Sequence, residues 1–239
     1  LGGGAVLFDL QPRKAVVNDI NEELINMYLV IRNNIDELIE SLKKHKNEKE
    51  YYYMIRELDR DKKKYKQLSN VEKASRMIFL NKTCYNGLFR VNFLGQFNVP
   101  FGRYKNPDIV NEAALRAVSE YLNKAKITFR CIDFEESVKG IRKGAFVYFD
   151  PPYDHISDTS SFTDYDMNGF DKKEQELLKK LCDKLEKQGV KFLLSNSATN
   201  FILDLYKDYN LMIVQARRSI NSNGNKRGEV AEVLVKNYD

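Results

Sequence analysis

The 239-residue sequence lacks tryptophan and contains only two histidines and three cysteines. The cysteines, Cys84, Cys131 and Cys182, are far apart and show no metal-binding spacing. Because only His45 and His155 could join them, we expect no zinc site and no other metal. Three thiols among many lysines suit a reducing compartment, so we expect a cytoplasmic protein.

No apolar run reaches the ~18 residues that a membrane helix needs, so we expect no membrane partner. The net charge of +5 is compatible with a nucleic-acid partner and equally with an ordinary basic protein. Hydrophobic residues make up 43% of the chain, which is enough for a sizeable core. The length suits one large domain or two small ones.

A glycine run, Gly2-Gly3-Gly4, stands near the start of the sequence. Such a run lets the backbone approach a ligand closely, although it could also be only a flexible end. A short strand is expected at residues 15–17, and Asn18 and Asp19 follow it. An acidic residue at the end of a strand is placed to bind ribose hydroxyls. Alternatively, one of these two residues caps the helix that follows.

Apolar residues recur at spacings of three and four from Glu22 to about Lys44, which predicts one long amphipathic helix. Residues 43–66 are highly charged and contain three consecutive tyrosines. They could form a basic, aromatic nucleic-acid surface, but a solvated helix pair with partly packed tyrosines is favoured. Further helices are expected at residues 71–80 and within residues 107–123.

Residues 81–103 are rich in Asn, Arg, Tyr and Gly and show little periodicity. Asn and Arg are the side chains that bind adenine and guanine edges bidentately. Aromatic side chains can wedge between bases when one is flipped out. The segment therefore predicts a loop and hairpin that read nucleic acid, with a polar surface hairpin as the alternative. A strand is expected at residues 127–132, with Asp133 after it as a possible helix cap.

The most informative stretch runs from Val147 to Tyr153. Its first half is apolar and predicts a buried parallel strand. Pro151 and Pro152 cannot donate to a sheet, so the strand must end before them. Asp150 and Tyr153 are thus expected at the carboxyl end of a strand, which is where ligands bind in open α/β sheets.

This tetrad suits methylation of an exocyclic amine on a flipped base. The amine is a poor nucleophile because its lone pair is spread into the ring. Asp150 and a backbone carbonyl held by the prolines could accept its two N–H groups and localise that lone pair. Tyr153 offers a face on which the extruded base can stack. The alternative is a plain strand-ending turn with a surface Asp and Tyr.

The rest of the chain continues the alternation of strands and helices. Residues 154–170 form a long polar segment, expected to close over the base. Asp171 should cap a helix at residues 172–188 that stops at Gly189. The remaining expected elements are a strand at 191–195, a helix at 198–206, and strands at 211–216 and 230–235 around an Asn-Gly hairpin. Arg217 and Arg218 flank that hairpin and are expected to contact phosphates.

With Leu1-Gly2-Gly3-Gly4, Asn18-Asp19-Ile20-Asn21 and Asp150-Pro151-Pro152-Tyr153 in this order, the sequence resembles the Dam-type (D12 class) DNA adenine-N6 methyltransferases over nearly its whole length. The resemblance implies S-adenosylmethionine as cofactor, S-adenosylhomocysteine as product and double-stranded DNA as partner. The residues it implies for the cofactor are Gly2, Gly3, Gly4, Asp19, Ile20, Asp133, Phe134 and Asp150. The catalytic residues it implies are Asp150, Pro151, Pro152 and Tyr153.

The resemblance extends to residues 81–103, which are similar to the target-recognition loop and hairpin of that family. The implied DNA-binding residues are Tyr85, Asn86, Arg90, Asn92, Asn98, Pro100 and Arg103. Phe93 and Leu94 depart from the pattern, because relatives often carry polar residues there. Relatives also have an upstream strand and a segment with Lys and Gly before it. Neither is in this sequence, so we expect it to be part of a longer protein.

The predicted fold is α/β, with a Rossmann-like methyltransferase sheet, an antiparallel last strand and an inserted, mainly helical target-recognition domain. The catalytic domain is expected at residues 1–24 and 114–239, and the recognition domain at residues 25–113. The predicted activity is methylation of adenine N6 in duplex DNA by a monomer, with GATC as target. The alternatives are a non-catalytic DNA-binding relative, or a methyltransferase acting on cytosine N4, RNA or protein glutamine.

Overall fold

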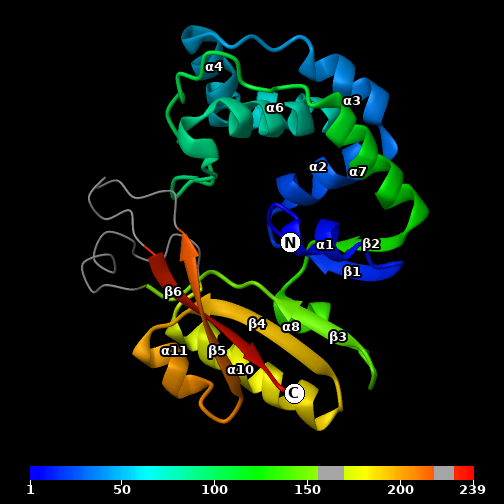
Figure 1. Ribbon diagram of the computed structural model, residues 1–239. Helices are drawn as coiled ribbons and strands as arrows, with labels where there is room; N and C mark the ends of the chain where they lie inside the picture. Colours follow the sequence, from blue (N-terminus) through cyan, green and yellow to red (C-terminus); the bar gives the residue numbers. More distant parts are fainter. Residues whose placement is uncertain (156–169, 218–228) are drawn as a thin grey trace. The chain divides into compact units, whose positions relative to one another are not determined.

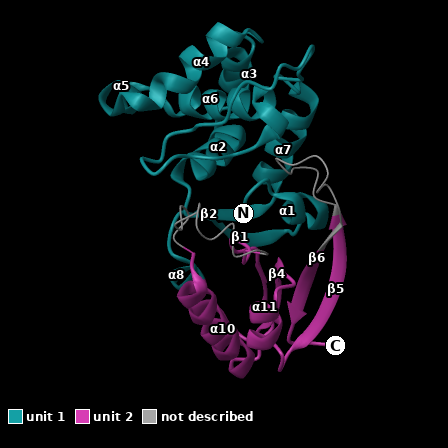
Figure 2. Cartoon of the chain, turned by 90° about the vertical axis from the view of Figure 1, so that its left-hand side faces the viewer, with its two compact units in different colours: residues 1–137 teal, residues 138–239 magenta. Residues whose placement is uncertain are grey.

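The computed structural model describes residues 1–155, 170–217 and 229–239. The chain divides into two compact units, residues 1–137 and 138–239 (Figure 2). Each unit has its own strands and helices. Among the described residues, no helix is both long and apolar enough to cross a membrane.

Unit 1 combines one pair of parallel strands with a set of helices (Figure 1). Its elements are α1 (Ala5–Leu10), β1 (Lys14–Asn18), α2 (Glu22–Asn33), α3 (Ile35–Leu42), α4 (Lys49–Arg56), the 3-10 helix η1 (Glu57–Arg60), α5 (Lys62–Gln67), α6 (Asn70–Thr83), the 3-10 helix η2 (Tyr85–Gly87), α7 (Glu112–Lys124), β2 (Lys126–Arg130) and α8 (Phe134–Ser137). Strands β1 and β2 pair in parallel, with Asn18 opposite Arg130 at their shared carboxyl end.

The single helix predicted for residues 22–44 is wrong, because the chain forms two helices that break at Asn34. This residue has φ −135° and ψ 43°, outside the helical region. Its side-chain Nδ2 donates to Glu37 at 2.9 Å, and such local bonds are why Asn competes with the helical backbone. The apolar spacing continues across the break because Ile31 of α2 and Leu38 of α3 belong to the same core.

Helix α6 contributes to two hydrophobic clusters and so joins the helical part of unit 1. One cluster includes Ile31, Leu38, Leu42, Ala74 and Ile78. The other surrounds Phe79 and includes Tyr52, Ile55, Leu80, Cys84, Phe97 and Val99. Tyr52 is fully buried and its hydroxyl donates to the carbonyl of Val99 at 2.8 Å. The prediction that the three tyrosines are partly packed is therefore confirmed for Tyr52, which does not belong to an aromatic surface.

Unit 2 is built on a four-stranded mixed sheet (Figure 1). Its elements are β3 (Phe146–Phe149), α10 (Lys172–Lys187), β4 (Lys191–Ser197), α11 (Asn200–Leu205), β5 (Asn210–Arg217) and β6 (Glu229–Lys236). The strand order is β3-β4-β6-β5, with β3 parallel to β4 and β6 antiparallel to both of its neighbours. The prediction of an antiparallel last strand is confirmed, whereas its Asn-Gly turn lies outside the described residues.

Helix α10 begins and ends where the sequence predicts. The side chain of Asp171 accepts from the backbone N–H groups of Lys173 and Glu174, and Gly189 follows the helix with φ 69°. A left-handed residue after the last turn favours glycine. The division into two compact units reflects packing, whereas the predicted domains were defined by function. The predicted catalytic domain (1–24 and 114–239) and recognition domain (25–113) therefore stay a prediction.

Candidate functional site

The carboxyl ends of β1 and β2 are tied together by one side chain. Nδ2 of Asn18 donates to the carbonyl of Ile132 at 2.8 Å, and the N–H of Ile132 donates to Oδ1 of Asn18 at 3.1 Å. An amide that binds both backbone groups of one residue acts as a short extension of the sheet. As a result, Asp19 and Asp133 follow their strands at the same edge of the parallel pair.

Asp19 organises the glycine run rather than capping the next helix. Its Oδ2 accepts from the N–H of Gly2 and its Oδ1 from the N–H of Asn21, both at 3.0 Å. Helix α2 is instead capped by Asn21, whose Oδ1 accepts from two N–H groups of the first turn. The alternative that Asn18 or Asp19 is the cap is therefore wrong. A carboxylate has about four lone-pair sites, so Asp19 can still accept from hydroxyl groups.

Gly4 cannot carry a side chain in this loop. Its φ is 73°, and a Cβ would lie 2.5 Å from a ring carbon of Phe8 and 2.9 Å from the hydroxyl oxygen of Tyr28. That hydroxyl donates to the carbonyl of Gly2 at 3.0 Å. Burial, together with the Asp19 carboxylate, raises the pKa of Tyr28 to about 12. Tyr28 thus stays a neutral donor that holds the glycine loop at the end of β1.

Ile20, Asp133 and Phe134 complete the residues predicted for a cofactor in unit 1. Ile20 is 74% exposed, which leaves its apolar surface available to a ligand. Oδ1 of Asp133 accepts from the N–H of Glu135 at 2.8 Å, and its carbonyl accepts from Ser137 at 3.0 Å. Asp133 therefore caps α8, as one of its two interpretations predicted, and its role toward a cofactor stays a prediction.

In unit 2, Asp150 follows β3 directly and is exposed. Its Oδ1 accepts from the hydroxyl of Ser195 at 3.1 Å, and the same hydroxyl lies 3.0 Å from that of Tyr148. Ser195 is 3% exposed, so a buried hydroxyl fixes the carboxylate. Burial raises the pKa of Tyr153, while a hydrogen bond with Ser195 acts in the opposite direction. One serine of β4 thus connects both polar members of the tetrad.

The backbone of the tetrad is held by two buried amides. Nε2 of Gln175, on α10, donates to the carbonyl of Pro152 at 2.9 Å. Asn196, on β4, donates its Nδ2 to Oε1 of Gln175 at 3.1 Å and accepts at Oδ1 from the N–H of Asp154 at 2.9 Å. Both side chains are at most 2% exposed. The turn is therefore fixed at Pro152 and at Asp154 by groups that cannot move freely.

Sequence reasoning missed Ser195, Gln175 and Asn196. Two of them carry a signal that could have been used, because a Ser-Asn pair directly follows the buried, apolar part of β4. A buried polar pair in a strand needs partners, and the end of a strand is where a site would provide them. Gln175 has no such signal, since it lies among charged residues of an amphipathic helix.

The predicted recognition segment is an irregular loop closed by two short bridges, between Cys84 and Phe101 and between Val91 and Phe97. Asn92 shapes its tip: Oδ1 accepts from the N–H groups of Leu94 and Gln96, each at 3.0 Å.

Other members of that segment are placed differently. Tyr85 is 44% exposed, and its N–H donates to the carbonyl of Pro100 at 2.8 Å. Asn86 and Arg103 have left-handed backbones, with φ 54° and 57°. Phe93, where family members often carry polar residues, is 85% exposed. The loop therefore exposes part of its surface, while Cys84, Phe97 and Val99 anchor it in the second hydrophobic cluster.

Two further groups of predicted residues lie partly or wholly beyond what the structure describes. Arg217 ends β5, but Arg218 lies outside the described residues. The same holds for residues 156–169 of the segment expected to close over a base. Within the described part of the chain, no group of three or more His, Cys, Asp and Glu side chains is placed to hold a metal ion.

The family of the chain follows from comparison with known proteins. Residues 1–220 match the model of the D12 class N6 adenine-specific DNA methyltransferases. The Type II methyltransferase M1.LlaDCHI of Lactococcus lactis subsp. cremoris is 45% identical over 240 residues, covering 100% of this chain and 84% of the relative. The Type II methyltransferase M.MjaIII of Methanocaldococcus jannaschii is 44% identical over 253 residues, with 100% and 86% covered.

A third relative, the DNA adenine methylase of Escherichia coli strain K12, is 34% identical over 239 residues, with 98% of this chain and 83% of the relative covered. The chain therefore belongs to the D12 class of N6 adenine-specific DNA methyltransferases, and the predicted resemblance is confirmed. It is an enzyme, an adenine-specific DNA methyltransferase.

Proposed function

We propose that the protein transfers a methyl group from S-adenosylmethionine to the N6 amine of an adenine flipped out of duplex DNA, within the sequence GATC. The observation that carries the proposal is the turn Asp150-Pro151-Pro152-Tyr153 at the end of β3, fixed by Ser195 and Gln175. A rigid carboxylate beside a proline-restricted backbone is what an amine with a delocalised lone pair requires.

Each member of the turn has a separate role in this reaction. The carboxylate of Asp150 accepts one N–H of the adenine amine, and the Asp150-Pro151 backbone accepts the other. With both hydrogens bound, the nitrogen lone pair is directed out of the ring plane. Tyr153 stacks on the extruded base. The amine loses its proton after the transfer, so no strong base such as His155 is needed.

The cofactor supplies an electrophilic sulfonium methyl group. The residues that would hold it are Gly2, Gly3, Gly4, Asp19, Ile20, Asp133, Phe134 and Asp150. The geometry of unit 1 fits this assignment, because the glycine loop is held against Tyr28 and Asp19 keeps acceptor capacity for ribose hydroxyls. The exposed side chain of Ile20 offers an apolar surface for the adenine ring of the cofactor.

The DNA contacts belong to residues 85–103 of the recognition segment, with phosphate contacts from Arg217 and Arg218. Arg90 would bind a base edge, because guanidinium is the group that binds guanine bidentately. The names of the two most similar relatives described above support a role in DNA modification alongside a restriction enzyme. GATC follows from the similarity of this segment to that of Dam-type enzymes.

We further propose that β1–β2 and the sheet of unit 2 belong to one Rossmann-like catalytic domain, residues 1–24 and 114–239, with residues 25–113 inserted for target recognition. Parallel pairing within β1–β2 and within β3–β4 supports this proposal. So does the position of the candidate site residues, which follow β1, β2 and β3 at their carboxyl ends.

The test uses tritiated S-adenosylmethionine and a duplex with one GATC site, beside the same duplex with that adenine already methylated. We expect label only in the unmethylated duplex. Equal labelling of both duplexes would contradict the target base. If neither duplex is labelled, other adenine-containing DNA sequences should be tested next, followed by RNA and protein acceptors. If no DNA duplex accepts the label, the proposed function is rejected.

A further inference from the structure

The side chain of Arg90 is aimed by a single neighbour across the hairpin. Nε of Arg90 donates to Oδ1 of Asn98 at 2.7 Å, and the N–H of Asn98 donates to the carbonyl of Arg90 at 3.1 Å. The first bond occupies Nε of the guanidinium, and Nη2 also donates to the carbonyl of Asn98 at 3.5 Å. Its outer fork, formed by the two terminal nitrogens, keeps N–H groups for a base edge. The direction of that fork therefore depends on where Asn98 lies.

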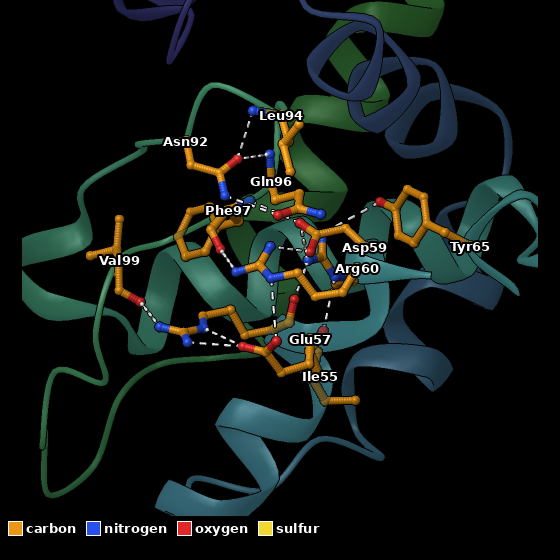
Figure 3. A network of polar contacts seen from close by, with 12 residues as sticks. Ile55, Glu57, Asp59, Arg60, Tyr65, Asn92, Leu94, Gln96, Phe97 and Val99 are labelled. Atoms are coloured by element: carbon orange, nitrogen blue, oxygen red, sulfur yellow. Dashed lines mark hydrogen bonds and ion pairs between the residues drawn. The ribbon is translucent and has the colours of Figure 1, made fainter. Parts of the chain in front are cut away.

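Asn98 in turn is placed by the residue before it, which is bound from η1. Oδ2 of Asp59 accepts from the N–H of Phe97 at 2.8 Å, and Nη2 of Arg60 donates to the carbonyl of Phe97 at 2.8 Å (Figure 3). Two consecutive side chains thus bind both backbone groups of one residue, as a neighbouring strand would. We call this pair of bonds the Asp59–Arg60 clamp.

The clamp is fixed to the helical core through a buried charge. Arg76 of α6 is 3% exposed, and its Nη2 lies 2.7 Å from Oδ2 of Asp59. The same guanidinium donates to the backbone carbonyls of Ile55 and Arg56 at 2.9 and 2.8 Å. A buried guanidinium needs its counter-ion, so Asp59 cannot turn away from Arg76. The position of Phe97 is thereby coupled to α6.

A second attachment lies two residues further along the same segment. The carbonyl of Val99 accepts from the buried hydroxyl of Tyr52 at 2.8 Å. The side chains of Phe97 and Val99 are buried, whereas Asn98 between them is half-buried and accepts from Arg90, which fits the alternation of side chains along an extended segment. Most of these residues come from α4 and η1, which lie in the predicted recognition domain but contain none of the predicted DNA-binding residues.

We propose that Asp59 and Arg60 are positioning residues for base recognition: by holding Phe97 they set Asn98, and through it the direction of the Arg90 fork toward DNA. The inference rests on the proposed function, since it needs DNA as the substrate. Arg60 acts within the protein in this proposal, because its guanidinium is already bonded to Glu57, Asp59 and the Phe97 carbonyl.

The decisive variant is Arg60→Met, which removes the bond to the Phe97 carbonyl but leaves the Asp59–Arg76 pair intact. Arg60→Lys is the conservative variant, because a lysine can still donate to that carbonyl. Glu57→Gln is the matched control: it removes an ion pair of Arg60 on the same 3-10 helix without touching the hairpin. Asp59→Asn is a second probe, in which Phe97 keeps an acceptor but Arg76 loses its nearer counter-ion and keeps only Glu23, at 3.9 Å.

The measurement is kcat/KM on the duplex that wild-type protein methylates and on duplexes with one base pair of that site changed. We expect Arg60→Met to lower the preference for the correct site by about tenfold at one base pair, the range of a lost bidentate contact. Its kcat at saturating DNA should stay close to that of wild type. Arg60→Lys should restore part of the preference, and Glu57→Gln should match wild type.

A role in stability alone predicts a different result. If Arg60→Met lowers the melting temperature but keeps the wild-type preference at every base pair, the inference is wrong, whatever the melting temperature of Asp59→Asn. An equal loss of preference in Glu57→Gln would also overturn it, because that variant keeps the clamp. If wild-type protein methylates no duplex, the proposed function itself is rejected. This outcome is distinct from failure of the inference, because wild-type protein is measured before any variant.

Discussion

At the scale of single residues, Asp150 is the side chain whose loss should be most specific to chemistry. It is exposed and accepts a hydrogen bond from Ser195, so its removal leaves the packing of β3 and β4 in place. In the proposed reaction its carboxylate accepts from the adenine amine as the amine attacks, in addition to its proposed contact with the cofactor. A defect at this position should therefore appear in the rate of transfer and not in stability or DNA affinity.

We predict that Asp150→Ala lowers kcat by about 100- to 1000-fold, the usual cost of losing one preorganised hydrogen-bond partner in a transition state. DNA affinity should stay within a few fold of wild type. Single-turnover transfer of the tritiated methyl group and fluorescence anisotropy with labelled duplex measure the two quantities. Asp150→Asn keeps an acceptor without the charge and should fall between. Wild-type turnover by Asp150→Ala would disprove the mechanism.

His45 is a half-buried titratable group that packs among side chains of unit 1. Its ring stacks on Phe79 at 4.3 Å between centroids, and its nitrogens lie 2.9 and 3.0 Å from the hydroxyls of Tyr51 and Ser75. Burial lowers its pKa to about 4. In the unfolded chain the pKa is about 6.5. Between these values the unfolded chain binds a proton that the folded protein does not.

We therefore predict that the free energy of unfolding decreases as pH falls from about 6.5 toward about 4, because protonation of His45 favours the unfolded chain in this window. The urea midpoint at several pH values measures the slope. His45→Gln can keep hydrogen bonds to Tyr51 and Ser75 but does not titrate, so its slope over this window should be shallower. Parallel slopes for the two proteins would show that His45 does not contribute.

At the scale of elements, the sequence predicts most helices and strands because a regular apolar spacing survives in each of them. Helix α10 and strand β2 lie close to their predicted bounds. The break at Asn34 was missed because the apolar spacing passes through it without interruption. The extension of α6 to Thr83 was missed because its last turn carries polar residues that the sequence analysis assigned to the recognition loop.

The candidate site divides in the same way. Asp19 and Asp150 were predicted because an acidic residue after an apolar strand is visible in the sequence. Ser195 and Gln175 were not, because their roles depend on contacts with residues 45 and 23 positions away. For Asn92 the residue type was misleading in part. Asparagine was predicted to bind a base edge, but the side-chain oxygen of Asn92 accepts from two N–H groups of its own turn.

Helix α10 should therefore affect catalysis although none of its residues belongs to the tetrad. We predict that Gln175→Met lowers the free energy of unfolding by about 1–3 kcal/mol, because the Pro152 carbonyl and the Asn196 amide lose a buried partner. It should also lower kcat about tenfold by loosening the turn, with little change in KM for DNA. Glu176→Met, on the exposed face of the same helix, is the matched control.

Stopped-flow methyl transfer and urea denaturation separate these two effects of Gln175→Met. A variant that loses stability but keeps the wild-type kcat would mean that the amide supports the core alone. A similar loss of kcat in Glu176→Met would point to a general effect of methionine on α10. Neither result would affect the role of Asp150, because that side chain is held by β4.

At the scale of the whole molecule, the two compact units each contain one fully buried thiol. Cys84 belongs to the second hydrophobic cluster of unit 1, and Cys182 is buried on α10 of unit 2. Burial raises the pKa of Cys84 to about 11 and that of Cys182 to about 12. Both should be protonated and shielded in the folded protein, so each reports the opening of its own unit.

We predict that a maleimide labels Cys84 and Cys182 at different urea concentrations, because each unit has its own buried core. The proposed cofactor residues come from both units, Asp19 from one and Asp150 from the other. S-adenosylhomocysteine at 100 times its dissociation constant should then slow the labelling of both thiols. The bound ligand can raise the free energy of unfolding by up to about 2.7 kcal/mol. Mass spectrometry of labelled peptides measures each thiol separately.

The pattern of protection distinguishes two ways of binding the cofactor. Protection of Cys84 alone would mean that the glycine loop and Asp19 bind the ligand without unit 2, and that Asp150 serves only the adenine. Protection of both thiols, lost in Asp19→Ala, would mean that the same ligand stabilises both units and that its binding depends on the Asp19 carboxylate.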